Sequence, residues 1–179
     1  MGNVIIGTTM SLDGFMNDRN GDISRLYPDL EELHRTEMLQ EEIQMTGAAV
    51  MGRRTYDMFE GDVTDYEFQV PIFVLTHAVP EQVAKGENDQ LTLTFITDGI
   101  ERAIEKAKAA AGDKDVMVIA GANTAQQCLR AGLVDDQAPA IPQRLESQMN
   151  RAARAWGVHA HSKNQWRYKI SRSSLQPIA

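Results

Sequence analysis

The chain has 179 residues, the usual size of one domain, and 42% of them are hydrophobic, enough for a single core. No apolar run approaches the ~20 residues that a membrane-spanning helix needs, which argues against a membrane protein. A single cysteine, Cys128, excludes an internal disulfide, and the N-terminus lacks the basic and apolar stretches of a secretory signal. We therefore expect a cytoplasmic protein.

The net charge of −7 is unevenly distributed along the chain. Residues 137–179 carry seven basic residues and one acidic residue, whereas residues 1–136 carry eleven basic and 24 acidic residues. Such asymmetry is typical of a basic tail that binds nucleic acid or acidic partners, and equally of a tail that docks on an acidic body. The acidic body argues against nucleic acid as a partner, because such binding normally needs a basic face.

The first third of the chain predicts a strand, a loop, a helix and a second strand. Val4-Ile5-Ile6 has the pattern of a strand, and residues 11–27, rich in Gly, Asp and Asn, predict a long ordered loop. A helix begins at Pro28-Asp29 and carries apolar residues at a spacing of about 3.6 as far as Ile43. Residues 48–51 then form a buried strand.

The next segments alternate strands with helices. A short helix packed by Tyr56, Met58 and Phe59 comes first, and strands over 71–76 and 91–96 follow it. The next helix has the core stripe Ile100, Ala103, Ile104, Ala107 and Ala111. A strand over 116–119 then leads to a helix with Ala125, Cys128 and Leu129 on its apolar side. Thr97-Asp98-Gly99 and Asn123 offer N-caps, and Gly112 and Gly132 end the two helices. The alternation predicts an α/β fold with a largely parallel central sheet.

After Asp136 this pattern weakens. Residues 137–142 contain two prolines and do not have the pattern of an apolar strand, although 144–156 could form a helix and 166–170 a strand. We therefore divide the chain into a body, residues 1–136, and an atypical basic segment, residues 137–179. That segment is either part of the same domain or a poorly ordered tail.

The most informative stretch is Met51 to Tyr56, which follows the strand over 48–51 and contains Gly52, Arg53, Arg54 and Thr55. A glycine at a strand end lets the backbone approach a ligand, and the N–H groups of a helix start, together with an arginine fork, can hold a phosphate. An arginine pair at a helix start is also typical of a solvated helix face. The motif therefore needs support from other segments.

Two other segments give that support, residues 8–16 after the first strand and residues 116–124. In this order, the three segments resemble the dihydrofolate reductase-like family. The specific parts of the match are Ser11-Leu12-Asp13-Gly14, Gly52-Arg53-Arg54-Thr55 and Ala131-Gly132-Leu133-Val134-Asp135. The match is best with the branch related to the reductase domain of bacterial riboflavin biosynthesis, and it covers roughly residues 1–136. This resemblance implies a three-layer fold with a central, largely parallel mixed sheet.

The resemblance also implies hydride transfer from NADPH to a small heterocyclic or carbonyl substrate. It assigns cofactor binding to Gly52, Arg53, Arg54, Thr55, Thr76, His77, Gly121, Ala122, Asn123 and Thr124. Arg53 would accommodate an adenosine 2′-phosphate, which favours NADPH over NADH. From the residues alone, His77 is equally a surface side chain. The family often has several glycines in the turn where this chain keeps only Gly121, so a helix start packed tightly on a strand remains an alternative there.

Asp13 is the candidate catalytic carboxylate, because the resemblance places its loop beside the nicotinamide. An Asp-Gly pair also forms turns routinely, and that alternative stays open. Asp29, Glu31 and Glu32 begin the first long helix, but none matches the pterin-binding motif, and acids there usually serve the helix dipole. We therefore do not expect dihydrofolate as the substrate.

The ending of the chain departs from the resembled family, in which closing antiparallel strands build much of the subunit contact. Either the tail has diverged or a reading-frame change replaced it, so the implied homodimer is less secure here.

A catalytically idle NADP(H)-binding or regulatory protein on the same fold is the alternative function. We expect no metal, since His159 and His161 lack nearby cysteines or carboxylates, and we expect Cys128 to be a buried thiol.

Overall fold

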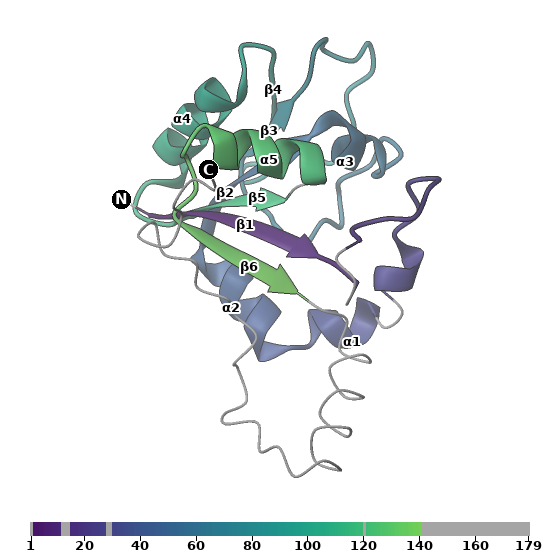
Figure 1. Ribbon diagram of the computed structural model, residues 1–179. Coiled ribbons are helices and arrows are strands. Elements are labelled where there is room, and N and C mark those ends of the chain that lie inside the picture. Colours follow the sequence, from purple (N-terminus) through teal and green to yellow (C-terminus); the bar gives the residue numbers. More distant parts are fainter. Residues whose placement is uncertain (1, 12–14, 28–29, 120, 141–179) are drawn as a thin grey trace, which may run out of the picture.

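The computed structural model describes residues 2–11, 15–27, 30–119 and 121–140 (Figure 1). Within these residues, six strands form one sheet in the order β4-β3-β2-β5-β1-β6, and every neighbouring pair among them is parallel. The strands are β1 Val4–Thr9, β2 Thr46–Gly52, β3 Ile72–Leu75, β4 Leu93–Ile96, β5 Asp115–Ile119 and β6 Asp136–Ala140. The predicted α/β fold with a largely parallel central sheet is confirmed.

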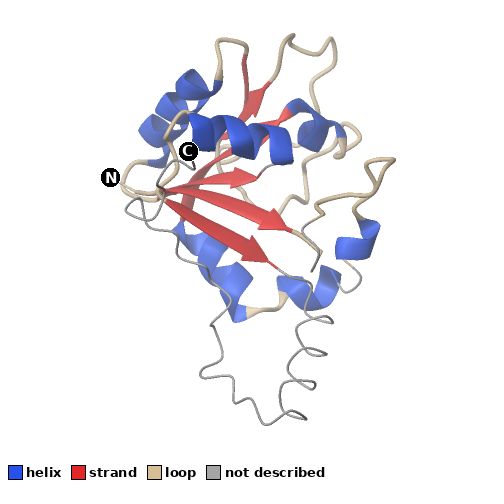
Figure 2. Cartoon of the chain, viewed as in Figure 1, coloured by secondary structure: helices blue, strands red, loops and turns tan. Residues whose placement is uncertain are grey.

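Helices cover both faces of the sheet and give three layers (Figures 1 and 2). The helices are α1 Leu30–His34, α2 Glu37–Met45, α3 Arg53–Asp57, α4 Ile100–Ala111 and α5 Ala122–Arg130, with a short 3-10 helix at Ser24–Leu26. The sequence predicted one helix from Pro28-Asp29 to about Ile43. That prediction is wrong, because the described part of this segment forms two helices, α1 and α2. Thr36 accepts a hydrogen bond from the backbone N–H of Leu39 and N-caps α2, which separates α2 from α1. Pro28 and Asp29 themselves lie outside the described residues.

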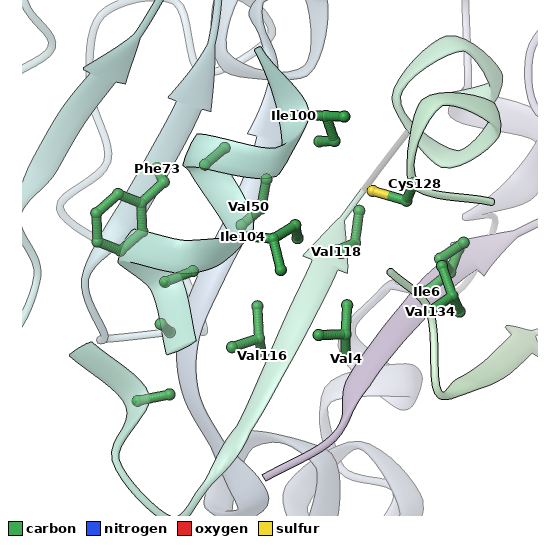
Figure 3. Packing of buried hydrophobic residues seen from close by; sticks show 14 of the residues in the cluster. Val4, Ile6, Val50, Phe73, Ile100, Ile104, Val116, Val118, Cys128 and Val134 are labelled. Atoms are coloured by element: carbon green, nitrogen blue, oxygen red, sulfur yellow. The ribbon is translucent and has the colours of Figure 1, made fainter. Parts of the chain in front are cut away.

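The first core lies between the sheet and helices α4 and α5 (Figure 3). Val4, Val50 and Val116 are fully buried from the strand side. All five residues of the predicted α4 stripe, Ile100, Ala103, Ile104, Ala107 and Ala111, are buried against them. Each fully buried isoleucine contributes about 1.5–3 kcal/mol to this layer. The 3.6-residue period of α4 therefore identified its buried face from the sequence.

The second core lies on the opposite face of the sheet. Met51, Ile72 and Val74 point to this side, where Tyr56 of α3 packs on them. The Tyr56 ring meets the Phe95 ring edge-on at a centroid distance of 5.2 Å, and the Tyr56 hydroxyl oxygen accepts a hydrogen bond of 2.7 Å from the Ala84 N–H. The buried Tyr56 thus fixes α3 against the sheet and against the loop that contains Ala84.

The ends of α4 and α5 were predicted only in part. Gly112 and Gly132 follow the two helices with φ of 63° and 66°, the left-handed conformation that glycine adopts without strain, as predicted. The N-cap of α4 is Gly99, within the predicted Thr97-Asp98-Gly99, and it makes no side-chain hydrogen bond. The predicted N-cap Asn123 is wrong, because Gly121 is the N-cap of α5 and Asn123 lies within its first turn.

Residues 137–140, in which the sequence does not have the pattern of an apolar strand, nevertheless belong to strand β6. Strand β6 pairs in parallel with β1, with Pro139 opposite Thr8. β6 is the outermost strand of the described sheet, where a proline, which lacks an N–H, is tolerated. The rest of the basic segment, including the predicted helix over 144–156 and strand over 166–170, lies outside the described residues. None of the described helices has the length and apolar character needed to cross a membrane.

Candidate active site

The described parts of the predicted site segments follow the carboxyl ends of parallel strands, among them β1, β5 and β6, whose arrowheads point the same way in Figure 2. The chain leaves β2 towards β3 on one side, and leaves β5 towards β6, beyond β1, on the other side. The direction of winding therefore reverses between the adjacent strands β2 and β5. In open α/β sheets, ligands bind outside the carboxyl ends of the strands at such a reversal.

Gly52 and Thr124 join two of the segments across this reversal. Gly52 ends β2, and a Cβ atom built on it would stand 2.6 Å from Thr124 Oγ1. The backbone of Gly52 has φ −83° and ψ 161°, which any residue can adopt, so glycine is needed here for space alone. Thr124 is 6% exposed and lies in the first turn of α5. The first turns of α3 and α5 are thus brought together.

Arg53 connects α3 to the turn that follows β3. Its Nε donates a hydrogen bond of 2.7 Å to Asp57 Oδ1, and its Nη1 donates one of 3.3 Å to the carbonyl oxygen of Ala78. Arg54 is exposed and makes no hydrogen bond or ion pair with any described residue. Two guanidinium groups therefore lie at the start of α3, one held in place and one extended into solvent.

Thr76 and His77 lie in the same turn. The Thr76 hydroxyl donates a hydrogen bond of 2.8 Å to the Ala78 carbonyl and accepts one from the Ala78 N–H, so it closes the turn that receives Arg53. Thr76 is buried and His77 is exposed. Direct phosphate contacts by Thr76, His77 and the half-buried Thr55 stay predictions.

The start of α5 has the properties of an anion site. Gly121 is its N-cap without a side-chain bond, and a Cβ atom at Gly121 would meet no atom within 4 Å. Ala122 and Asn123 are exposed, and the side-chain Oδ1 of Asn123 accepts a hydrogen bond from Gln127 Nε2 rather than capping the helix. Open space beside uncapped N–H groups at a helix N-terminus fits a phosphate.

Residues 12–14, including the candidate catalytic Asp13, lie outside the described residues. The residues on either side of them are joined directly after β1. The Ser11 N–H donates to the Phe15 carbonyl at 2.8 Å, and the Phe15 N–H donates to Ser11 Oγ at 3.0 Å. Phe15 is 65% exposed. The ends of the loop that carries Asp13 are therefore held at the carboxyl edge, and the role of Asp13 stays a prediction.

Cys128 is fully buried on the inner side of α5 (Figure 3). Burial raises the pKa of its thiol to about 11, so little of it is thiolate at neutral pH. This environment agrees with the prediction of an inert buried thiol. His159 and His161 lie outside the described residues, and among the described residues no three His, Cys, Asp or Glu side chains gather to hold a metal ion.

Two residues of the site were missed from the sequence. Asp57 stands four residues after Arg53 on α3, a spacing that favours an ion pair on a helix, so a signal was present. Ala78 contributes only its carbonyl oxygen, for which no residue type gives a signal.

Comparison with known proteins identifies the family. A search of curated proteins found no match. A crystal structure of a protein from Shewanella sp. PV-4, which bears a provisional name as a riboflavin biosynthesis protein, superposes with a TM-score of 0.60 and 25% identity, over 76% of this chain and 75% of that one. The RibD C-terminal domain family matches residues 3–138. The resemblance to the riboflavin-biosynthesis branch of the dihydrofolate reductase-like fold is thus confirmed, and the chain belongs to the RibD C-terminal domain family.

Proposed function

We propose that the protein is an NADPH-dependent reductase that transfers a hydride to a small heterocyclic or carbonyl substrate. Membership of the RibD C-terminal domain family supports a reductase-like role of the riboflavin-biosynthesis type. The observation that carries the finer proposal is the contact of Gly52 with Thr124, because it brings an arginine pair and an uncapped helix start to one point at the winding reversal.

The residues present fit a dinucleotide with an extra phosphate. The N–H groups of Ala122 and Asn123 and the open space over Gly121 suit the pyrophosphate, while Arg53 and Arg54 suit a 2′-phosphate through charge-assisted hydrogen bonds. When bound, reduced nicotinamide supplies the hydride, and the protein supplies position and electrostatics. On the substrate side, we propose Asp13 as the polar group and the exposed Phe15 ring as an apolar surface.

The assembly and the compartment belong to the same proposal. We propose a homodimer that works in the cytoplasm on a small-molecule substrate, without a membrane or nucleic acid. The alternative is a catalytically idle NADP(H)-binding protein. The two differ only in turnover, since both bind the cofactor.

The test begins with the binding of NADPH and NADH, followed by fluorescence, and continues with the decay of NADPH absorbance against a panel of pterins, flavin precursors and quinones. Saturable NADPH binding with turnover of one panel member supports the reductase. Saturable binding without turnover on the whole panel supports the idle protein. A protein that binds neither cofactor contradicts both.

Variants at Gly121 separate cofactor binding from helix stability. Gly121→Asp and Gly121→Ser both place a good N-cap on α5 in open space, so both should leave thermal stability equal or higher. The aspartate adds a negative charge where the pyrophosphate would bind. We therefore expect Gly121→Asp to weaken the binding of NADPH at least tenfold more than Gly121→Ser does. Equal NADPH affinity in the two variants would contradict a phosphate at the α5 N-terminus.

A further inference from the structure

The side chain of Arg53 is held at two points, one on its own helix and one outside it. On α3, Asp57 Oδ1 accepts from Nε at 2.7 Å, and beyond β3, the Ala78 carbonyl accepts from Nη1 at 3.3 Å. The Ala78 carbonyl is itself fixed by the Thr76 hydroxyl at 2.8 Å. Asp57, Arg53 and the turn at Ala78 therefore form one connected unit.

This arrangement leaves most of the guanidinium available to a ligand. An arginine has five N–H donors in a rigid planar fork, and only one on Nε and one on Nη1 have partners among the described residues. Neither N–H of Nη2 has a partner within the part of the chain that the structure describes. The Arg53 and Asp57 side chains are 39% and 51% exposed, so solvent and ligand can reach the pair. The fork is thus fixed on one side and open on the other.

We propose that Asp57 is a positioning residue for phosphate specificity, which holds the Arg53 fork against the Ala78 turn so that its remaining donors receive the cofactor 2′-phosphate. This inference rests on the proposed function. Arg53 is the group that touches the phosphate, and Asp57 acts through Arg53. Without Asp57, the long flexible arginine side chain would have to lose its rotamer freedom when the phosphate binds.

Asp57 also has an opposing effect, because its carboxylate carries a negative charge near a phosphate dianion. Water screens this repulsion, since both members of the pair are about half exposed. The hydrogen bond to Nε, in contrast, acts directly at short range. We therefore expect the positioning effect of Asp57 to exceed its charge effect.

Two substitutions separate the effects. Asp57→Asn keeps an oxygen that can accept from Arg53 Nε but removes the charge, whereas Asp57→Ala removes both. We would measure the dissociation constants of NADPH and NADH for the full chain and for each variant. The matched control is Glu105→Ala, which breaks the exposed Arg102–Glu105 ion pair of 2.6 Å on α4.

If Asp57 positions Arg53, Asp57→Ala should weaken the binding of NADPH by up to about fivefold and leave the binding of NADH unchanged. A loss of this size is the range expected for a half-exposed ion pair. Asp57→Asn should restore most of the NADPH preference, and Glu105→Ala should leave both affinities unchanged. Tighter NADPH binding in Asp57→Ala, or an equal loss for both cofactors, overturns the inference while the proposed function stands. Failure of the unsubstituted protein to bind either cofactor overturns both.

Discussion

Gly52 and Thr124 approach so closely across the β2–β5 boundary that one methyl group at position 52 would stand 2.6 Å from the Thr124 hydroxyl oxygen. Real Cβ atoms do not approach an oxygen this closely, so the Thr124 side chain or one of the two segments would have to shift. This contact between the start of α3 and the start of α5 gives the first prediction.

Gly52→Ala should destabilise the protein by about 1–3 kcal/mol, the usual cost of overpacking. Thr124→Ala should relieve the clash, because the next nearest atom, Thr124 Cβ, is an ordinary 3.9 Å away. Urea unfolding of both single variants and the double variant forms a double-mutant cycle. Thr124→Ser keeps the hydroxyl and serves as the control that gives no relief. Additive effects of the alanine substitutions would contradict the contact.

Arg53→Ala should remove most of a preference for NADPH over NADH. We expect that preference to be at least tenfold, because a charge-assisted contact contributes about 1.5–3 kcal/mol. Competitive fluorescence titration of the two cofactors measures it. The argument fails if the unsubstituted protein binds both cofactors with equal affinity.

Asp13→Asn should lower turnover far more than it lowers NADPH affinity, if the carboxylate faces the substrate. Steady-state kinetics and cofactor titration on the same preparation distinguish these effects. Normal turnover combined with a lower melting temperature would instead favour the alternative that Asp13 only forms a turn with Gly14.

Cys128 should make folding stability fall as the solution becomes alkaline. The folded-state pKa of its thiol is about 11, raised by burial from a value of 9.0. The folded protein therefore holds this proton more tightly than the unfolded chain, so the contribution is complete below about pH 9 and is lost between about pH 9 and pH 11. Two units correspond to an upper bound of about 3 kcal/mol.

Cys128→Ala isolates this effect from the other groups that titrate at high pH. The unfolding free energy of the unsubstituted protein should drop more steeply between pH 8 and about pH 11 than that of the variant. Alkylation of the native thiol should also be slow, at a rate set by unfolding. Parallel pH profiles, or rapid labelling of the folded protein, would show that the thiol is accessible.

The sequence predicted best those features that depend on the residues of a single helix or turn. The α4 stripe and the glycines at 112 and 132 were predicted because period and backbone freedom are local properties. The break at Thr36 was missed because an apolar period continues across it while the cap depends on one hydroxyl. β6 was missed because its pairing with β1, rather than its proline-containing composition, makes it a strand.

The candidate site shows the same difference between local patterns, which the sequence displays, and contacts between distant segments, which it does not. Gly52, Arg53 and Gly121 were predicted from motifs at strand ends, and in the structure Gly52 ends β2 and meets Thr124 of α5, the helix that Gly121 precedes. Their role in binding a cofactor stays a prediction. Which donors of Arg53 are used could not be predicted, because one partner is a backbone carbonyl from a different turn. The use of Thr76 inside that turn likewise depends on backbone geometry that the sequence does not display.

The place of β1 in the sheet has a consequence for how the protein is made. β1 is synthesised before the other five strands, yet its two neighbours are β5 and β6. The backbone N–H groups of Asn3, just before β1, and of Val4, its first residue, donate to Asp115 and Asp135, 112 and 131 positions away. Strands β2, β3 and β4 can pair while the chain is still growing. β1 can pair only after β5 and β6 have been made, so its place in the sheet is filled late, by contacts between segments far apart in the sequence.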